Sequence, residues 1–186
     1  MSNAARVPQY QIEKLLLERN SPRAFSGEAI TEQELMTMFE AARWAASSYN
    51  DQPWRYVYAM AGDAEWQSFF DLLVPGNQIF TKQAAALIIV FSRKIFEKNG
   101  EFSPTHSYDT GAAGQNFALQ GFAMGLSVHQ LGGFDFVRAH ALLKLTDKYA
   151  VEAMISVGRP VAKAPGEQKL SGRKQLQEIV FRGEFK

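Results

Sequence analysis

Hydrophobic and polar residues follow one another along this chain with two periods, one typical of helices and the other of strands. Apolar residues spaced by three and four positions predict six helices. These helices are expected over Tyr10–Arg19, Thr31–Ala46, Asp63–Leu73, Gln78–Gln83, Tyr108–Leu126 and Phe136–Leu145. Continuous or alternating apolar runs predict four strands. The strands are expected over Trp54–Met60, Ala84–Phe91, Ser127–Leu131 and Tyr149–Val157.

Short local signals mark the ends of several of these elements. Thr31 and Glu34 have the spacing of a capping box, in which each residue's side chain binds the backbone N–H of the other. Asp63 is expected to cap the third helix. The residues VPGN at Val74–Asn77 are expected to form a turn before the fourth helix. Ala84–Phe91 is apolar throughout, which is typical of a strand buried on both faces.

The composition is that of an ordinary globular protein. The chain has 186 residues, of which 46% are hydrophobic and 21% charged, and its formal net charge is +1. We expect one domain over residues 1–186, with residues 163–186 as a C-terminal extension. So small a net charge gives no reason to expect nucleic acid or an anionic membrane as a partner. No apolar run suits a membrane span or a signal peptide, so we expect a cytoplasmic protein.

Several kinds of chemistry are excluded by the residues themselves. The chain has no cysteine, which excludes disulfides, thiolate metal ligands and a cysteine nucleophile. The spacing of His106, His129 and His140 matches no zinc motif, so we expect no metal site. A dinucleotide-binding glycine motif after the first strand, a P-loop and a nucleophile elbow are absent as well.

Two polar segments lie between apolar elements and are candidates for binding. Ala45–Trp54 (AASSYNDQPW) leads from a helix to a strand through Ser, Asn and Gln, a setting in which small-molecule sites are common. Ser92–Ser107 is expected to be a loop, and whether it closes over a substrate stays open. Phe96 and Phe102 in this loop are expected to pack in the core.

Glycine and phenylalanine are used in ways that fit two interpretations. The Gly- and Ala-rich helix Tyr108–Leu126 suits either a packed core or a contact between subunits, and so do the 14 Phe residues. Gly132 and Gly133 form either a tight turn or a place where the backbone approaches a ligand. The apolar stub Leu176–Phe181 is prone to form a strand, and a tail of this kind often docks on a neighbouring chain.

Six segments carry a resemblance to one family through their order and spacing. They are Arg19–Phe25 (RNSPRAF), Ala41–Trp54 (AARWAASSYNDQPW), Asn77-Gln78, Asp109-x-Gly111, Gly132–Asp135 (GGFD) and Val157–Pro160 (VGRP). On these segments the chain resembles the FMN-dependent nitroreductases over nearly its whole length. The resemblance implies an α+β fold with a central mixed β-sheet flanked by helices. It also implies an obligate homodimer with exchanged C-terminal segments and two FMN sites at the interface.

The resemblance implies an activity and a set of FMN ligands. NADH or NADPH would reduce the flavin at N5, and a nitroaromatic, quinone or similar electron-poor acceptor would oxidise it in a ping-pong cycle, with no side chain as obligatory acid or base. Arg19 and Ser21 would hold the phosphate with Arg173, and Asn20 would contribute at the phosphate or the ribityl chain. Arg23 would lie near N1 and the C2 carbonyl. The other implied ligands are Ser47, Ser48 and Asn50 from the second subunit, Asn77 at the pyrimidine edge, and the backbone of Leu131, Gly132 and Gly133 near N5 and O4.

The chain departs from the family pattern at three positions. Ala46 stands where the family usually has Pro, Asn20 where it has a second basic residue, and Ser171 where some relatives have Lys. FMN binding is expected to survive these changes. The alternatives are a flavin-binding or storage protein without turnover and a specialised relative that fragments flavin or removes halogen. Tyr49 is expected to shape the acceptor pocket, and His129 to be a core histidine.

Overall fold

The chain forms two compact units in the computed structural model, which describes residues 6–162 and 170–185. Residues 21–161 make up what we call the core unit. Residues 1–20 and 162–186 make up the terminal unit. The N-terminal segment and the C-terminal tail therefore fold with each other, although they are far apart in the sequence.

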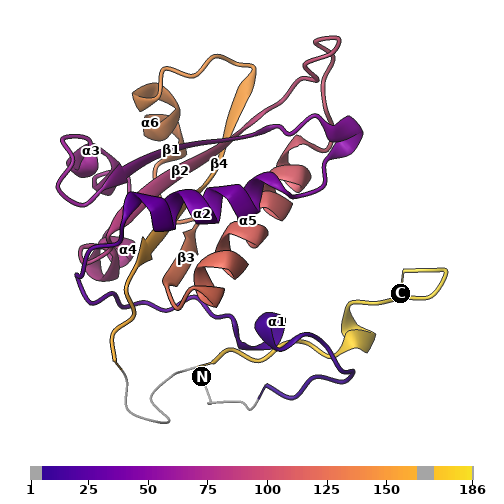
Figure 1. The fold of residues 1–186 in the computed structure, drawn as a ribbon. Helices are drawn as coiled ribbons and strands as arrows, with labels where there is room; N and C mark the ends of the chain where they lie inside the picture. The colour runs from indigo at the N-terminus through magenta and orange to yellow at the C-terminus, as the bar shows by residue number, and fades with distance from the viewer. Residues whose placement is uncertain (1–5, 163–169, 186) are drawn as a thin grey trace. The chain divides into compact units, whose positions relative to one another are not determined.

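The core unit is built on a four-stranded sheet (Figure 1). Its strands are β1 (Trp54–Met60), β2 (Ala86–Arg93), β3 (Ser127–Leu131) and β4 (Tyr149–Gly158), in the spatial order β1-β2-β4-β3. All three pairings are antiparallel. The expected mixed sheet is therefore wrong for the described chain: β2 and β3 run in the same direction, but β4 lies between them and is antiparallel to both. The edges of the sheet are β1 and β3.

Helices cover both faces of this sheet. The α2 (Glu32–Arg43) and α5 (His106–Ala123) helices pack on one face, where they share a core cluster with Ile88 and Val90. The other face carries the shorter helices α3 (Trp66–Phe70), α4 (Pro75–Thr81) and α6 (Phe136–Leu142). Successive residues of β2 point to opposite faces, and every residue of this strand is buried. The apolar run of the sequence follows from this double burial.

The α2 helix begins at the predicted capping box. The Thr31 hydroxyl accepts from the Glu34 N–H at 3.1 Å, and the Glu34 carboxylate accepts from the Thr31 N–H at 2.8 Å. The same carboxylate forms an ion pair with Arg159 at 2.8 Å, which joins α2 to the end of β4. The helix ends at Arg43, three residues before the predicted end.

Four local predictions need correction. Asp63 does not cap α3, because its carboxylate accepts the Met60 N–H at 2.7 Å and closes a turn instead. The predicted turn at 74–77 is helical, since Pro75 takes the first position of α4, where its missing N–H costs nothing. The α1 helix spans only Lys14–Glu18. The C-terminal stub contains the 3-10 turn η2 (Leu176–Glu178) and no strand in the residues described.

The long helix and both short strands agree with the sequence prediction. The α5 helix begins at His106, two residues before the predicted start, while β1 and β3 have the predicted bounds. Within the described part of the chain, no helix has the length and apolar character that a membrane crossing requires.

Candidate functional site

The loop between α2 and β1 has an unusual backbone. It contains the 3-10 turn η1 (Ser48–Asn50), and three of its residues have left-handed φ angles, 53° at Tyr49, 56° at Asn50 and 47° at Gln52. Residues other than glycine adopt the left-handed region at a cost of about 1 kcal/mol or more each, and such residues cluster at functional sites. The Ser47 hydroxyl accepts from the Gln52 N–H at 3.0 Å and closes the loop. Contacts from outside must hold the rest of this conformation.

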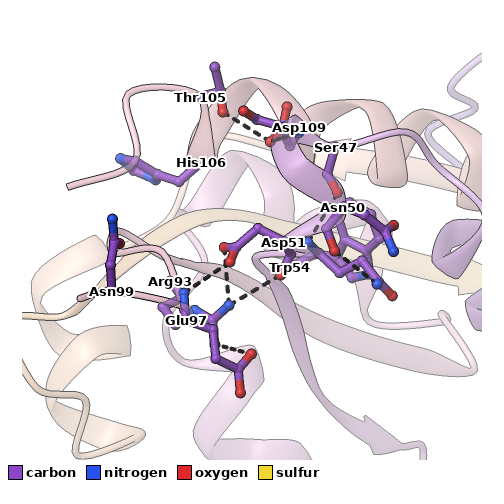
Figure 2. Close-up of polar contacts among 12 residues, drawn as sticks. Ser47, Asn50, Asp51, Trp54, Arg93, Glu97, Asn99, Thr105, His106 and Asp109 are labelled. Atoms are coloured by element: carbon purple, nitrogen blue, oxygen red, sulfur yellow. Dashed lines mark hydrogen bonds and ion pairs between the residues drawn. The ribbon is translucent and has the colours of Figure 1, made fainter. Parts of the chain in front are cut away.

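The first outside contact is a buried ion pair at the end of β2. Arg93 pairs with Asp51 at 3.0 Å, and the two side chains are 10% and 7% exposed (Figure 2). The second oxygen of Asp51 accepts the Glu97 N–H at 2.9 Å, and Glu97 pairs with Arg93 at 2.6 Å. Burial lowers the pKa of Arg93, but its hydrogen bonds to Glu97 and Asp51 raise the pKa by more. Arg93 therefore keeps its charge and fixes the loop to the sheet.

The second outside contact comes from the first turn of α5. The buried carboxylate of Asp109 accepts from the Ser48 N–H and from the Thr105 hydroxyl, each at 3.0 Å (Figure 2). Ser48 is thus held through its backbone, which leaves its hydroxyl available to a ligand. Ser47 and Ser48 are half-buried, and Asn50 is exposed. The structure brings these three predicted ligands together on one loop.

A second group of predicted ligands meets at the turn after β3. Asn77, in α4, donates to the Gly133 carbonyl at 2.8 Å, and the Val74 N–H donates to the same oxygen at 3.1 Å. A Cβ on Gly133 would lie 2.7 Å from the Asn77 side-chain nitrogen, so any larger residue would have to displace the Asn77 side chain. Gly132 is exposed with free space around it, while the Leu131 side chain is buried in the core. Leu131 can therefore offer a ligand only its backbone.

The segment that precedes Arg23 is anchored to β3. His129 Nδ1 donates to the Pro22 carbonyl at 3.0 Å, and its ring lies 5.0 Å from that of Phe80. His129 is therefore a packing residue, as predicted. Ser21 and Arg23 flank the anchored proline, and both are exposed.

The terminal unit brings three arginines together. Arg6 donates from Nη1 to the carbonyls of Leu17 and Arg19, both at 2.7 Å, and from Nε to Ser171 at 3.1 Å. Arg173 donates to the same Ser171 carbonyl at 3.2 Å. Burial lowers the pKa of Arg19, and the charges of Arg173 and Arg6 lower this pKa further.

This arginine group has the character of an anion site. Within the described residues, Arg6 and Arg173 donate to backbone carbonyls, and no carboxylate pairs with either. Both side chains line a cavity of about 500 Å³ in the terminal unit. Clustered guanidinium groups of this kind are suited to a phosphate. Asn20 donates to the Glu18 carbonyl at 3.4 Å.

The two ligand groups of the core unit lie at opposite edges of the sheet. The loop over residues 47–52 leads into β1, whereas Gly132 and Gly133 follow β3. Three strand spacings of about 4.8 Å separate these edges, about 14 Å in all. The sequence predicted both groups but could not place them. The two groups of predicted ligands are therefore separated within one chain.

The segment between β2 and α5 is shorter and more ordered than predicted. Ile95 and Phe102 form a bridge, so residues 94–103 make a small hairpin. Phe96 is buried, as expected, but Phe102 is 63% exposed and does not pack in the core. Phe96 meets the Tyr49 ring edge-on at 5.6 Å, which ties the hairpin to the loop over residues 47–52.

Sequence reasoning missed the residues that position the predicted FMN-binding side chains. Asp51 and Asp109 lie within two of the motifs, but no local sequence pattern indicates that their carboxylates accept from backbone N–H groups. Arg93 offered a signal, because a charged residue at the end of an apolar strand is expected to have a buried partner. Arg6 offered none, since it lies thirteen positions before Arg19 in an unremarkable segment.

Comparison with known proteins agrees with this architecture. The chain matches the sequence model of the Nitroreductase family over residues 16–159. It is 30% identical to an oxygen-insensitive NADPH nitroreductase of Helicobacter pylori, over 78% of this chain and 65% of that one. It is 26% identical to an NADH dehydrogenase of Thermus thermophilus, over 95% and 98% of the two chains.

Solved structures share the fold. A crystal structure described as an oxidoreductase containing FMN superposes with a TM-score of 0.90 at 37% identity, covering 100% of this chain and 99% of the other. A nitroreductase structure in complex with FMN from Desulfovibrio desulfuricans superposes at 0.75 with 24% identity, over 95% and 100%. These matches define the class as an α+β protein of the nitroreductase fold. The chain belongs to the nitroreductase family.

Proposed function

We propose that this protein is an FMN-dependent oxidoreductase that uses NADH or NADPH to reduce electron-poor acceptors such as nitroaromatics and quinones. Support comes from the family membership and from its relatives, which include an NADPH nitroreductase and an oxidoreductase containing FMN. The observation that carries the proposal is the contact between Asn77 and Gly133. It fixes the turn after β3 at a point where an added Cβ would displace the Asn77 side chain.

The residues fit FMN by their chemistry. Arg19 and Arg173 are proposed to hold the phosphate, with Arg6 keeping both in position and Asn20 and Ser21 contributing polar groups. Asn77 and the backbone of Leu131, Gly132 and Gly133 suit the polar edge of the ring. A further cation, Arg23, is proposed to lie near N1 and the C2 carbonyl of the flavin, where a positive charge stabilises the reduced, anionic ring. The loop residues Ser47, Ser48 and Asn50 are proposed to complete the site.

We propose a homodimer because the two groups of predicted ligands in one chain lie at opposite sheet edges. In a symmetric dimer the loop of one chain can meet the Gly133 turn of its partner, so each flavin would use both chains. Tyr108 and Trp44 are 82% and 74% exposed, and large aromatic side chains of this kind are typical of interfaces. The C-terminal segment is proposed to exchange between partners.

The protein's proposed part in the reaction is to bind and orient the cofactor. When bound, FMN would supply hydride-transfer chemistry between NAD(P)H and an electron-poor acceptor. The hydrogen bonds from Asn77 and the Val74 N–H to the Gly133 carbonyl would hold the turn beside the ring in one conformation. We assign no side chain the role of acid or base.

Spectroscopic titration tests the proposal. The purified protein should bind FMN with a change in the flavin absorption bands, and anaerobic NADH or NADPH should bleach them rapidly. A bound flavin that is not bleached would indicate a storage or binding protein instead. An acceptor panel then separates nitro and quinone reduction from loss of halide.

The phosphate assignment has its own control in the same experiment. Riboflavin lacks the phosphate, so Arg6→Met should weaken the binding of FMN about tenfold but leave riboflavin binding unchanged. Equal weakening of both would show that Arg6 supports the fold only. Lys14→Met, which removes an exposed cation of α1, is the matched control.

A further inference from the structure

A cavity of about 470 Å³ lies beside the loop over residues 47–52 in the core unit. Its wall includes side chains from the loop, from the start of β1 and from the hairpin, among them Tyr49, Asn50, Gln52, Arg55, Glu97 and Lys98. Asn50 is also one of the proposed FMN ligands. The cavity therefore adjoins the place where molecules that react with the flavin are expected to bind.

Both acidic residues of this cavity pair with a single arginine. Asp51 and Glu97 lie 3.0 and 2.6 Å from Arg93, whose one positive charge offsets one of their two negative charges. Asp51 also accepts the Glu97 N–H, so its two oxygens are both occupied within the protein. With Arg55 and Lys98 added, the three cations and two carboxylates in and beside the cavity leave a net positive charge.

The basic residues of the cavity, Lys98 and Arg55, in contrast form no ion pair within the described chain. The Lys98 ammonium lies 3.5 Å from the centroid of the Tyr49 ring and 5.6 Å from that of Phe96, and no carboxylate in the described chain pairs with it. A cation over ring faces loses part of its water but keeps its charge. Arg55 uses only Nη1, which donates to the Gln52 and Trp54 carbonyls at 2.9 and 2.7 Å.

Both cations are held before any ligand arrives. The backbone of Tyr49 is held in its left-handed conformation between residues fixed by Asp109 and Arg93, and its ring meets Phe96 edge-on. The hairpin that carries Lys98 is closed by the Phe96 N–H to Glu101 carbonyl bond at 2.8 Å. A cation that is already in position binds an anion with a smaller loss of side-chain conformational entropy.

We propose that Lys98, with Arg55 beside it, forms a subsite for a carboxylate or phosphate group on the molecule that reacts at the flavin. This inference rests on the proposed function. The anionic group has two possible carriers, an acidic acceptor or the 2′-phosphate of NADPH. In both cases Lys98 sets specificity and takes no part in the chemical step.

Substitution at Lys98 separates the two carriers. For the acceptor arm, kcat/KM is measured for 4-nitrobenzoate and for the neutral 4-nitrobenzamide. For the coenzyme arm, kcat/KM is measured for NADPH and for NADH. In the arm that uses the subsite, Lys98→Met should lower the ratio of the two kcat/KM values about fivefold. That ratio is 4-nitrobenzoate over 4-nitrobenzamide in the acceptor arm and NADPH over NADH in the coenzyme arm. Lys98→Arg, which keeps the charge, should retain most of the wild-type ratio.

Binding without turnover gives an independent readout. The oxidised, FMN-loaded protein is titrated calorimetrically with 4-nitrobenzoate and with 2′-phospho-AMP. Lys98→Met should raise the Kd of one of them about fivefold, and added salt should weaken that ligand's binding to wild type more than to the variant. Lys94→Met is the matched control, because Lys94 is the first residue of the same hairpin but does not line the cavity.

The outcomes distinguish this proposal from the one it rests on. If both specificity ratios and both Kd values are the same in Lys98→Met and wild type, the subsite does not exist, although the flavin chemistry stands. If wild type binds no FMN or is not bleached by NAD(P)H, the proposed function fails, and the subsite proposal fails with it.

Discussion

At the scale of single residues, the two glycines after β3 look alike in sequence and differ in the structure. Gly132 has no heavy atom within 4 Å of where a Cβ would stand, whereas at Gly133 the Asn77 nitrogen and a Val74 methyl lie at 2.7 and 3.0 Å. The difference arises from α4, which lies more than fifty residues earlier in the chain. No local pattern could have shown which glycine is required.

This difference makes a prediction about paired alanine variants. Gly133→Ala should push Asn77 aside, lower the free energy of unfolding by about 1–3 kcal/mol and weaken FMN binding. Gly132→Ala should be close to neutral for stability, because space is free there. Urea unfolding and FMN titration of both variants measure the effect. Equal stability of the two variants would contradict the close contact at Gly133.

At the scale of elements, prediction succeeded where the determining contacts are local. The capping box placed the start of α2, and apolar runs found β1 and β3 at their observed bounds. Prediction failed at Asp63, whose side chain prefers a tight turn to a helix cap. Prediction also located the polar loop over residues 47–52 but not its backbone conformation. Arg93 and Asp109 hold that conformation through hydrogen bonds to residues 42 and 61 positions away in the sequence.

The capping box of α2 leads to a prediction about pH. The hydrogen bond from the Thr31 N–H, with help from Arg159, lowers the pKa of Glu34 below its ordinary value of 4.5. The unfolded chain then binds more protons than the folded chain below about pH 4.5, so this stabilisation is present above that pH and is lost as the pH falls through the lower, folded pKa.

Glu34→Gln should therefore destabilise the protein by about 1 kcal/mol or less at pH 6, and by less at pH 3. Urea unfolding at the two pH values measures the change. Glu28→Gln is a matched control, because no ion pair of the described chain involves Glu28. A Glu34→Gln effect that is the same at both pH values would show that charge on Glu34 is unimportant.

At the scale of the whole molecule, the antiparallel sheet determines how one chain can build a site. Its order, β1-β2-β4-β3, places the loop before β1 and the turn after β3 at opposite edges. The motifs alone gave the order of the ligands along the chain and not their separation in space. The symmetric dimer that we propose would resolve this separation, because each edge of one chain could face the opposite edge of the other.

Subunit complementation tests whether the site is shared in this way. Ser48→Phe adds bulk to the loop half, and Gly133→Val fills the turn half, so each variant alone should bind FMN poorly. In a mixed dimer, the intact loop of the Gly133→Val chain meets the intact turn of the Ser48→Phe chain. One site of that dimer is then wild type and the other carries both changes. We expect about one FMN per mixed dimer, measured by absorbance after the two variants are unfolded and refolded together. If the whole site lies within one chain, the mixture should bind no more FMN than the separate variants do, because no chain then has both halves intact.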